Sequence, residues 1–202
     1  MNYFSLNNKN HKVSFKQAVI NGLAPDKGLY FPDNITSLPT TFFENIENSS
    51  NEEIAFEAIK QFVGDEIPEI ILKQIIAETL CFDFPCVKVE DNVYSLELFH
   101  GPTMAFKDVG ARFMSRCMGY FNQNSEEKNT VLVATSGDTG GAVASGFLGV
   151  KNVEVIILYP SGKVSDIQER QLTTLGKNIK ALEVNGVFDD CQDMVKNAFL
   201  DK

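Results

Sequence analysis

The feature that most constrains the fold is an alternation of strand-like and helix-like segments after residue 129. The first expected strand, Val131-Leu-Val-Ala134, is wholly apolar, which is typical of a parallel strand covered on both faces. Such strands are joined through helices by right-handed crossovers, so the pattern predicts an α/β sheet. The expected strands and the helices that follow them are 131–134 with 139–148, 153–158 with 165–175, and 179–184 with 188–200.

A loop rich in hydroxyl groups and glycine follows the first of these strands, with the sequence Thr135-Ser-Gly-Asp-Thr-Gly-Gly141. A strand-to-helix loop of this kind directs free backbone N–H groups and the helix dipole at one point, which favours a carboxylate or phosphate there. The hydroxyls of Thr135, Ser136 and Thr139 add donors. The alternative is that Ser136 or Asp138 only caps the helix, while the glycines allow close packing on the sheet.

One lysine stands where a turn meets a helix. An expected hairpin of residues 86–89 and 93–98 leads into His100-Gly-Pro-Thr-Met-Ala-Phe-Lys107-Asp108. Lys107 is expected to be partly desolvated, which favours the neutral, nucleophilic amine that Schiff-base chemistry requires. The alternative is a solvated lysine beside Asp108, which complements the helix dipole. The apolar face expected for the following helix comprises Gly110, Phe113, Met114, Cys117, Met118 and Phe121.

We expect two domains, a mainly helical N-terminal domain over residues 1–84 and an α/β domain over residues 85–202. In the first domain, Ser14, Asn51 and Pro68 each stand at the expected start of a helix. In the second, the loops at Thr135, Tyr159 to Gly162 and Gly186 follow successive strands. Ligands bind beyond the carboxyl ends of parallel strands, so these loops are expected at one functional edge.

Composition limits the classes of partner. The net charge is −9 and no dense run of lysine or arginine is present, which argues against nucleic acid or an anionic membrane surface as a partner. The polar opening residues and the lack of a long apolar run lead us to expect a cytoplasmic protein. The four cysteines are dispersed and suggest no metal site. Cys86 and Cys117 are expected to be buried thiols in a reducing compartment.

Three further positions each have two interpretations. His100 could contact a cofactor or substrate, or could satisfy turn carbonyls. Lys163 could help to hold a phosphate, with Gln168 at the same end, or could be a solvated lysine before a helix capped by Ser165. Asp189 and Asp190 are expected to complement the dipole of the last helix.

Together the motifs resemble the threonine synthase family, pyridoxal-phosphate (PLP) enzymes with a tryptophan synthase β-like fold of PLP fold type II. The segments that carry the resemblance are Ser14–Val19, Gly28–Pro32, Phe99–Asp108, Ala134–Gly140, Tyr159–Gln168 and Phe188–Gln192. The resemblance implies the conversion of O-phosphohomoserine and water to threonine and phosphate, the last step of threonine biosynthesis, by a lyase.

The resemblance also implies residue roles. Lys107 is the lysine that forms the internal aldimine with pyridoxal 5'-phosphate and then shuttles protons. Phe106, Lys107 and Asp138 are assigned to the cofactor, and His100, Thr103, Thr135, Ser136, Gly137, Asp138, Thr139, Gly140 and Lys163 to the substrate. The wider fold type commonly has asparagine where this chain has Asp138. An ionised carboxylate cannot donate a hydrogen bond to the cofactor ring oxygen, and Ser-Gly-Asp-Thr-Gly favours the threonine synthase branch.

Members of the family run well beyond residue 202, and the resemblance places the loop for the cofactor phosphate in that later part. We therefore expect the remainder of the polypeptide to complete the active site, and the 202-residue piece to be inactive alone. Two other classes of function stay open from the sequence. One is a non-catalytic binder of phosphate or amino-acid phosphates, or a phospho-lyase of the same fold, and the other is a structural subunit.

Overall fold

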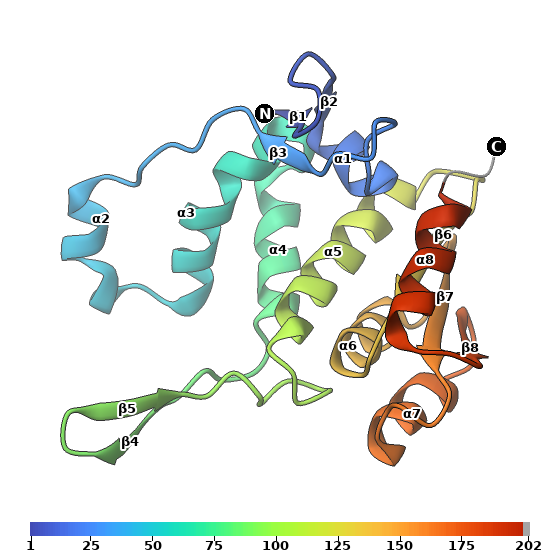
Figure 1. Cartoon of the computed structure of the whole chain (residues 1–202). Helices are drawn as coiled ribbons and strands as arrows, with labels where there is room; N and C mark the ends of the chain where they lie inside the picture. The colour runs from blue at the N-terminus through green and yellow to red at the C-terminus, as the bar shows by residue number, and fades with distance from the viewer. Residues whose placement is uncertain (200–202) are drawn as a thin grey trace. The chain divides into compact units, whose positions relative to one another are not determined.

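The computed structural model describes residues 1–199, and the chain forms two compact units, Met1–Cys81 and Phe82–Lys202 (Figure 1). The end of the last predicted helix, Leu200, lies outside the described residues. In the part of the chain that is described, no helix is both long enough and apolar enough to cross a membrane.

The first unit combines a small antiparallel sheet with helices. The sheet has the strand order β2-β1-β3. Its elements are β1 (Asn2–Ser5), β2 (Lys12–Ser14), α1 (Phe15–Asn21), β3 (Tyr30–Pro32), α2 (Thr40–Glu44), η1 (Ile46–Asn48), α3 (Asn51–Val63), η2 (Gly64–Glu66) and α4 (Glu69–Thr79).

The predicted helix starts of this unit are confirmed. Ser14 accepts a hydrogen bond from the backbone N–H of Gln17 at the start of α1, and Ser50 does the same for Glu53 at the start of α3. Such caps satisfy backbone donors that have no partner inside the helix. Pro68 immediately precedes α4. The three-stranded sheet was not predicted, because strands of three or four residues are too short to show a period.

Two polar side chains connect separate elements of the first unit: Tyr3 links β1 to α3, and Glu66 links η2 to α1. The Tyr3 hydroxyl donates to the Phe62 carbonyl at 2.9 Å. The Glu66 carboxylate accepts hydrogen bonds from the backbone N–H groups of Phe15 and Lys16 at 2.7 and 3.0 Å, at the start of α1. An acidic group in this position also complements the helix dipole.

The second unit contains the predicted α/β sheet. Its elements are β4 (Cys86–Glu90), β5 (Val93–Leu96), α5 (Lys107–Asn122), β6 (Asn129–Ala134), α6 (Asp138–Phe147), β7 (Val153–Pro160), α7 (Asp166–Thr173), β8 (Ile179–Val184) and α8 (Phe188–Ala198). The strands β6, β7 and β8 are parallel, as expected, and they lie in the order β6-β7-β8. Because the two crossovers advance in one direction, α6 and α7 share a face, and α8 packs on β6 and β7 from the other face (Figure 1).

Burial in this sheet differs from strand to strand. The central strand β7 carries the buried side chains Val155 and Ile157, whereas β6 is half-buried. The apolar run 131–134 therefore forms the predicted parallel strand, but this strand is half-buried, so the expectation that both of its faces are covered is wrong.

The helices α5 and α6 pack at close range. A Cβ atom added to Gly146 would meet the Ala111 carbonyl carbon and oxygen at 3.1 Å, so the absence of a side chain lets the backbones approach. The predicted apolar face of α5 is only partly confirmed. Small and polar residues occupy much of the buried side of this helix, which suits its close packing on α6. The buried residues of α5 are Asp108, Ala111, Ser115, Cys117, Met118 and Asn122.

The cysteines divide into two classes. Cys117 is fully buried, as predicted, and burial raises the pKa of its thiol to about 12, so that it stays protonated near neutral pH. Cys86 is exposed in the hairpin of β4 and β5, so the prediction that it is buried is wrong.

The phenol of Tyr3 makes the stability of the fold depend on pH. Its pKa is raised from 10.0 to about 12 by burial and by the charge of Glu66. A raised pKa in the folded state contributes stability below the unfolded value, and this contribution is lost as the pH rises through the folded value. Between about pH 10 and pH 12, the wild-type chain should lose roughly 2 kcal/mol more unfolding free energy than Tyr3→Phe.

Urea unfolding followed by circular dichroism at several pH values measures this difference. The phenylalanine variant is the matched control, since the other tyrosines and the lysines titrate equally in both proteins. Parallel pH dependence of the two proteins would contradict the assigned environment of Tyr3.

Candidate functional site

The register of the parallel sheet aligns the carboxyl ends of its strands. Ala134 of β6 lies opposite Leu158 of β7, and Leu158 lies opposite Leu182 of β8. The loops that begin at Thr135, Ser161 and Asn185 therefore emerge at one edge of the sheet, as the sequence predicted. The amino-terminal end of α5 lies at the same end of this unit (Figure 1).

The side chain of Thr135 builds the loop after β6. It is 1% exposed, and its hydroxyl oxygen accepts hydrogen bonds from the backbone N–H groups of Gly137 and Gly140 at 3.0 and 2.9 Å. The same hydroxyl donates to the Gly137 carbonyl at 3.1 Å. The hydroxyl thus satisfies two of the donors that the start of α6 would otherwise leave without a partner.

Two glycines allow this loop to form. Gly137 precedes α6 with φ of 144°, a conformation that side chains rarely adopt. A Cβ atom at Gly137 would meet the Gln168 amide nitrogen at 2.4 Å, and one at Gly140 would meet Thr135 Cγ2 at 2.5 Å. The glycines therefore allow close packing, as in the alternative interpretation. Because they have no side chain, they also leave the backbone of the loop uncovered at these two positions.

The donors that Thr135 does not use belong to the first turn of α6. The N–H groups of Asp138 and Thr139 have no carbonyl four residues earlier within the helix. The side chains of Ser136, Asp138 and Thr139 are exposed. This helix start can therefore present backbone donors, two hydroxyl groups and the positive end of the helix dipole to an anion.

The carboxylate of Asp138 is held by the first turn of α7. The Gln168 side-chain amide donates a hydrogen bond to Asp138 Oδ1 at 2.7 Å. The oxygen of that amide accepts hydrogen bonds from the backbone N–H and hydroxyl of Ser165, which caps α7. The expectation that Ser165 caps a helix and Gln168 faces the same end is confirmed. The pairing of Gln168 with Asp138 had no signal in the sequence, because it joins residues 30 positions apart.

The turn before Lys107 is held by Asp108, which is 1% exposed. Its carboxylate accepts hydrogen bonds from the backbone N–H and hydroxyl of Thr103 at 2.9 and 2.7 Å. A Cβ atom at Gly101 would meet the same carboxylate at 2.5 Å. Asp108 is therefore more than a charge at the helix start, because it fixes the Gly-Pro-Thr turn that precedes Lys107.

Lys107 is the first residue of α5, and its side chain is half-buried. Its amino nitrogen lies 5.0 Å from the centre of the exposed Phe106 ring, a distance typical of a cation–π contact. Within residues 1–199, no carboxylate forms an ion pair with Lys107. Its amine is thus accessible and not occupied by a counter-ion.

Two other candidate residues lie on the flanking loops. His100 Nε2 is 2.7 Å from a carboxylate oxygen of Glu97, and the imidazole stacks on Phe99. Its partner is therefore a carboxylate, and not the turn carbonyls of the alternative interpretation. Lys163 is exposed in the turn after β7, two residues before the cap of α7. Asp189 and Asp190 lie in the first turn of α8, where they were expected to complement the helix dipole, and Asp190 also accepts a hydrogen bond from the Val187 backbone N–H at 2.8 Å.

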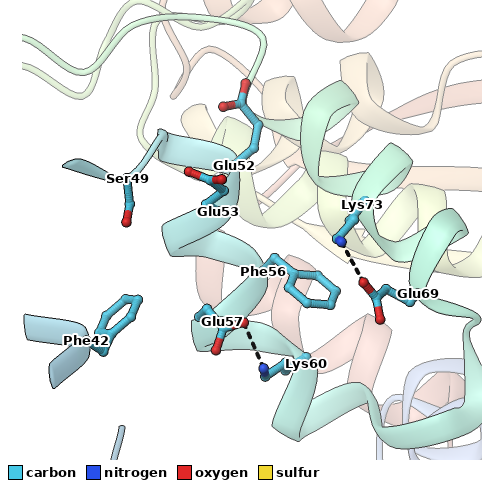
Figure 2. A pocket seen from close by; sticks show the side chains of 9 residues that line it. All are labelled: Phe42, Ser49, Glu52, Glu53, Phe56, Glu57, Lys60, Glu69 and Lys73. Carbon is cyan, nitrogen blue, oxygen red and sulfur yellow. Dashed lines mark hydrogen bonds and ion pairs between the residues drawn. The ribbon is translucent and has the colours of Figure 1, made fainter. Parts of the chain in front are cut away.

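A groove of about 620 Å³ lies in the first unit among α2, α3 and α4 (Figure 2). Lys60 pairs with Glu57 and Lys73 with Glu69, so both lysines that line the groove are already neutralised. None of the predicted site residues contributes to it. Among the described residues, no group of three or more histidine, cysteine, aspartate or glutamate side chains is arranged to hold a metal ion.

Comparison with known proteins gives concordant matches along the chain. The family model of the threonine synthase N terminus matches residues 2–80, and that of the pyridoxal-phosphate dependent enzymes matches residues 72–202. The threonine synthase of Escherichia coli is 43% identical over 202 residues. That match covers 100% of this chain and 47% of the relative. The chain thus spans about half the length of the relatives it matches.

Solved structures agree with the sequence matches. The crystal structure of threonine synthase from Escherichia coli superposes with a TM-score of 0.93 at 42% identity, over 100% of this chain and 47% of that one. The PLP-bound threonine synthase from Brucella melitensis gives a TM-score of 0.88 at 38% identity, over 100% of this chain and 45% of that one. The predicted fold class, PLP fold type II, is therefore confirmed. From its sequence and its fold alike, the chain belongs to the family of pyridoxal-phosphate dependent enzymes.

Proposed function

We propose that this chain supplies part of the active site of a cytoplasmic threonine synthase, which converts O-phosphohomoserine and water to threonine and phosphate with PLP. The observation that carries the proposal is an accessible lysine at the start of α5, at the same end of the unit as the donor-rich start of α6. The threonine synthases that match the whole chain support the choice of reaction.

The residues present fit the cofactor. PLP requires a primary amine, and Lys107 offers one that is half-buried and free of a counter-ion among residues 1–199. When bound, the cofactor stores the electrons that are released at the substrate's α carbon. In this proposal, Lys107 Nζ would hold the cofactor, and as a free amine it would move protons at the α and β carbons of the substrate. The exposed Phe106 ring beside the amine would pack against the cofactor.

The start of α6 is proposed to bind the substrate carboxylate. The backbone N–H groups of Asp138 and Thr139 and the hydroxyls of Ser136 and Thr139 would donate to it. The buried Thr135 would act as a positioning residue, because its hydroxyl is already committed to Gly137 and Gly140. Asp138 would be kept away from the anion by its bond to Gln168.

The flanking residues would serve the other end of the substrate. Lys163, in the exposed turn after β7, is proposed to attract the phosphate group. His100 is proposed to line the site with its imidazole oriented by Glu97. Thr103 would contribute through the shape of the turn that it forms with Asp108. The remaining polypeptide of the relatives would complete the site, so the 202-residue chain alone should be inactive.

The role of Lys107 can be tested in a joined polypeptide, in which residue 202 of this chain is followed by the part of Escherichia coli threonine synthase that the match does not cover. Lys107→Ala should lower threonine formation by a factor on the order of 10³ or more, because the amine that holds PLP and moves the protons is lost. Borohydride reduction followed by peptide mapping should place the bound cofactor on Lys107 in the unsubstituted protein.

The matched control is Lys151→Ala, which removes an exposed lysine of the same unit. It should keep the activity and the mapped cofactor. Full threonine formation by Lys107→Ala would refute the proposed function. Stabilisation by O-phosphohomoserine without any reduced cofactor would instead indicate a binding module.

The positioning role of Thr135 predicts a loss of stability. Thr135→Val keeps the shape of the side chain but leaves two buried N–H groups without a partner, which should cost on the order of 2 kcal/mol or more. Thr135→Ser keeps the hydroxyl and should lose about 1 kcal/mol or less. Urea unfolding of the 202-residue chain measures both values. Equal stability of the valine and wild-type chains would exclude the role.

A further inference from the structure

The side-chain amide of Gln168 joins the first turns of α7 and α6. Its nitrogen donates a hydrogen bond to Asp138 Oδ1 at 2.7 Å. Its oxygen accepts hydrogen bonds from the backbone N–H and the hydroxyl of Ser165 at 3.2 and 2.9 Å, which closes the cap of α7. Both ends of one side chain are therefore used, one for the helix that carries it and one for the helix that begins the candidate anion site.

The cap of α7 does not by itself require glutamine. In a capping box, the third helical residue has to accept a hydrogen bond, and both glutamate and glutamine can do so. This chain uses both, since Glu53 occupies that position in α3 and Gln17 occupies it in α1. A glutamate would also complement the dipole of α7. The cap leaves the NH₂ group of Gln168 unused, and this donor, which glutamate lacks, binds Asp138.

The acidic residue in the first turn of α6 is Asp138. A carboxylate in this position is attracted to the free backbone N–H groups and to the positive end of the helix dipole. Within residues 1–199, however, the Asp138 carboxylate accepts no hydrogen bond from the backbone of that turn, and its partner is Gln168. Without this bond, the exposed carboxylate would be free to turn onto the N–H groups that are proposed to bind the substrate carboxylate.

The packing at Gly137 lets Gln168 reach Asp138. Gly137 is buried, and a Cβ atom there would lie 2.4 Å from the amide nitrogen and 2.7 Å from the amide oxygen of Gln168. The Gln168 amide therefore lies directly against the residue that precedes α6. Because its oxygen is bound to Ser165, the amide cannot swing away without breaking the cap of α7. The donor that faces Asp138 is thus held in place from the α7 side.

We propose that Gln168 is a positioning residue, which keeps the start of α6 open to the substrate carboxylate by holding the competing carboxylate of Asp138 against α7. Gln168 itself does not contact the substrate in this proposal, because both ends of its amide are occupied. The identity of the anion rests on the proposed function, whereas the bond between Gln168 and Asp138 does not. The alternative is a purely structural bond that joins α6 to α7, and the two roles predict different behaviour of Asp138.

Nuclear magnetic resonance of the 202-residue chain tests the holding of Asp138 without any turnover. Gln168→Met keeps the length of the side chain but removes both its donor and its acceptor. At neutral pH, the amide proton of Thr139 should shift downfield in this variant, because the released carboxylate becomes its hydrogen-bond partner. The shift should be lost on acidification to about pH 3, where aspartate side chains are mostly protonated. The wild-type chain should show no such acid-dependent shift.

The matched control is Gln171→Met. Gln171 lies on α7 and also packs on a glycine of α6, since a Cβ atom at Gly141 would meet its side-chain oxygen at 2.8 Å. Its amide makes no hydrogen bond within residues 1–199. The substitution should therefore leave the Thr139 amide proton as it is in the wild-type chain. An unchanged Thr139 amide in Gln168→Met would overturn the proposal, because Asp138 would then keep its place without Gln168.

A double-mutant cycle in the joined polypeptide tests the effect on the substrate. Gln168→Met should raise KM for O-phosphohomoserine by at least about tenfold and lower kcat by less than about threefold, because a competing carboxylate weakens binding and not the chemical step. In an Asp138→Asn background, the same substitution should raise KM by less than about twofold, because the released side chain is then neutral. The comparison does not depend on what Asp138→Asn does by itself.

A purely structural bond would give a different pattern. Gln168 can also donate to the side-chain oxygen of asparagine, so Gln168→Met would break the bond in both backgrounds. Equal increases of KM in the two backgrounds would therefore overturn the proposal, and so would an unchanged KM in both. A joined polypeptide that forms no threonine would refute the proposed function. The Thr139 amide shift would then decide alone whether Gln168 holds the Asp138 carboxylate away from the start of α6.

Discussion

The candidate site depends on the three hydrogen bonds of the Thr135 hydroxyl. This group lies directly after β6, where the parallel register brings the strand ends to one edge. By binding Gly137 and Gly140 from inside the protein, it fixes the loop while the donors of the first helical turn of α6 stay outside. A buried donor without a partner costs about 1–3 kcal/mol, so the loop conformation and the buried hydroxyl require each other. Ligand binding can then use a backbone that is already ordered.

Much of the second unit could be predicted from the sequence because its signals are local. Each strand and helix from Asn129 to Ala198 has its own apolar run or cap, such as Ser165 at the start of α7. The order of these elements and the handedness of crossovers then determine which loops share an edge. Lys107 and residues 135–140 could be selected as candidate site residues for the same reason, since they lie where a turn meets the start of a helix.

The remaining features could not be predicted, because they depend on contacts between distant residues or on burial. The bond between Gln168 and Asp138 joins the first turns of α7 and α6, and nothing in either segment indicates the other. The burial of Asp108 shows that an acidic residue at a helix start can hold a turn as well as complement a dipole. The strands β1 to β3 are too short to show a period. The pattern around Cys86 correctly predicted a strand, but the prediction that its side chain is buried is wrong. The formation of a strand and the burial of its side chains are separate properties.

Because strand formation and burial are separate properties, the second unit can have a packed core next to an exposed hairpin and a half-buried lysine, Lys107. The α/β layers close by themselves, because Gly146 lets α5 and α6 meet and the side chains of β7 fill the space between the helical layers. The side chains of the hairpin are exposed, so its apolar residues add nothing to the core of this unit. Lys107 stands at the junction, with its helix anchored in the closed part and its preceding turn continuous with the open part. Its position is therefore fixed by the packed helix, while the turn before it leads back to an exposed hairpin.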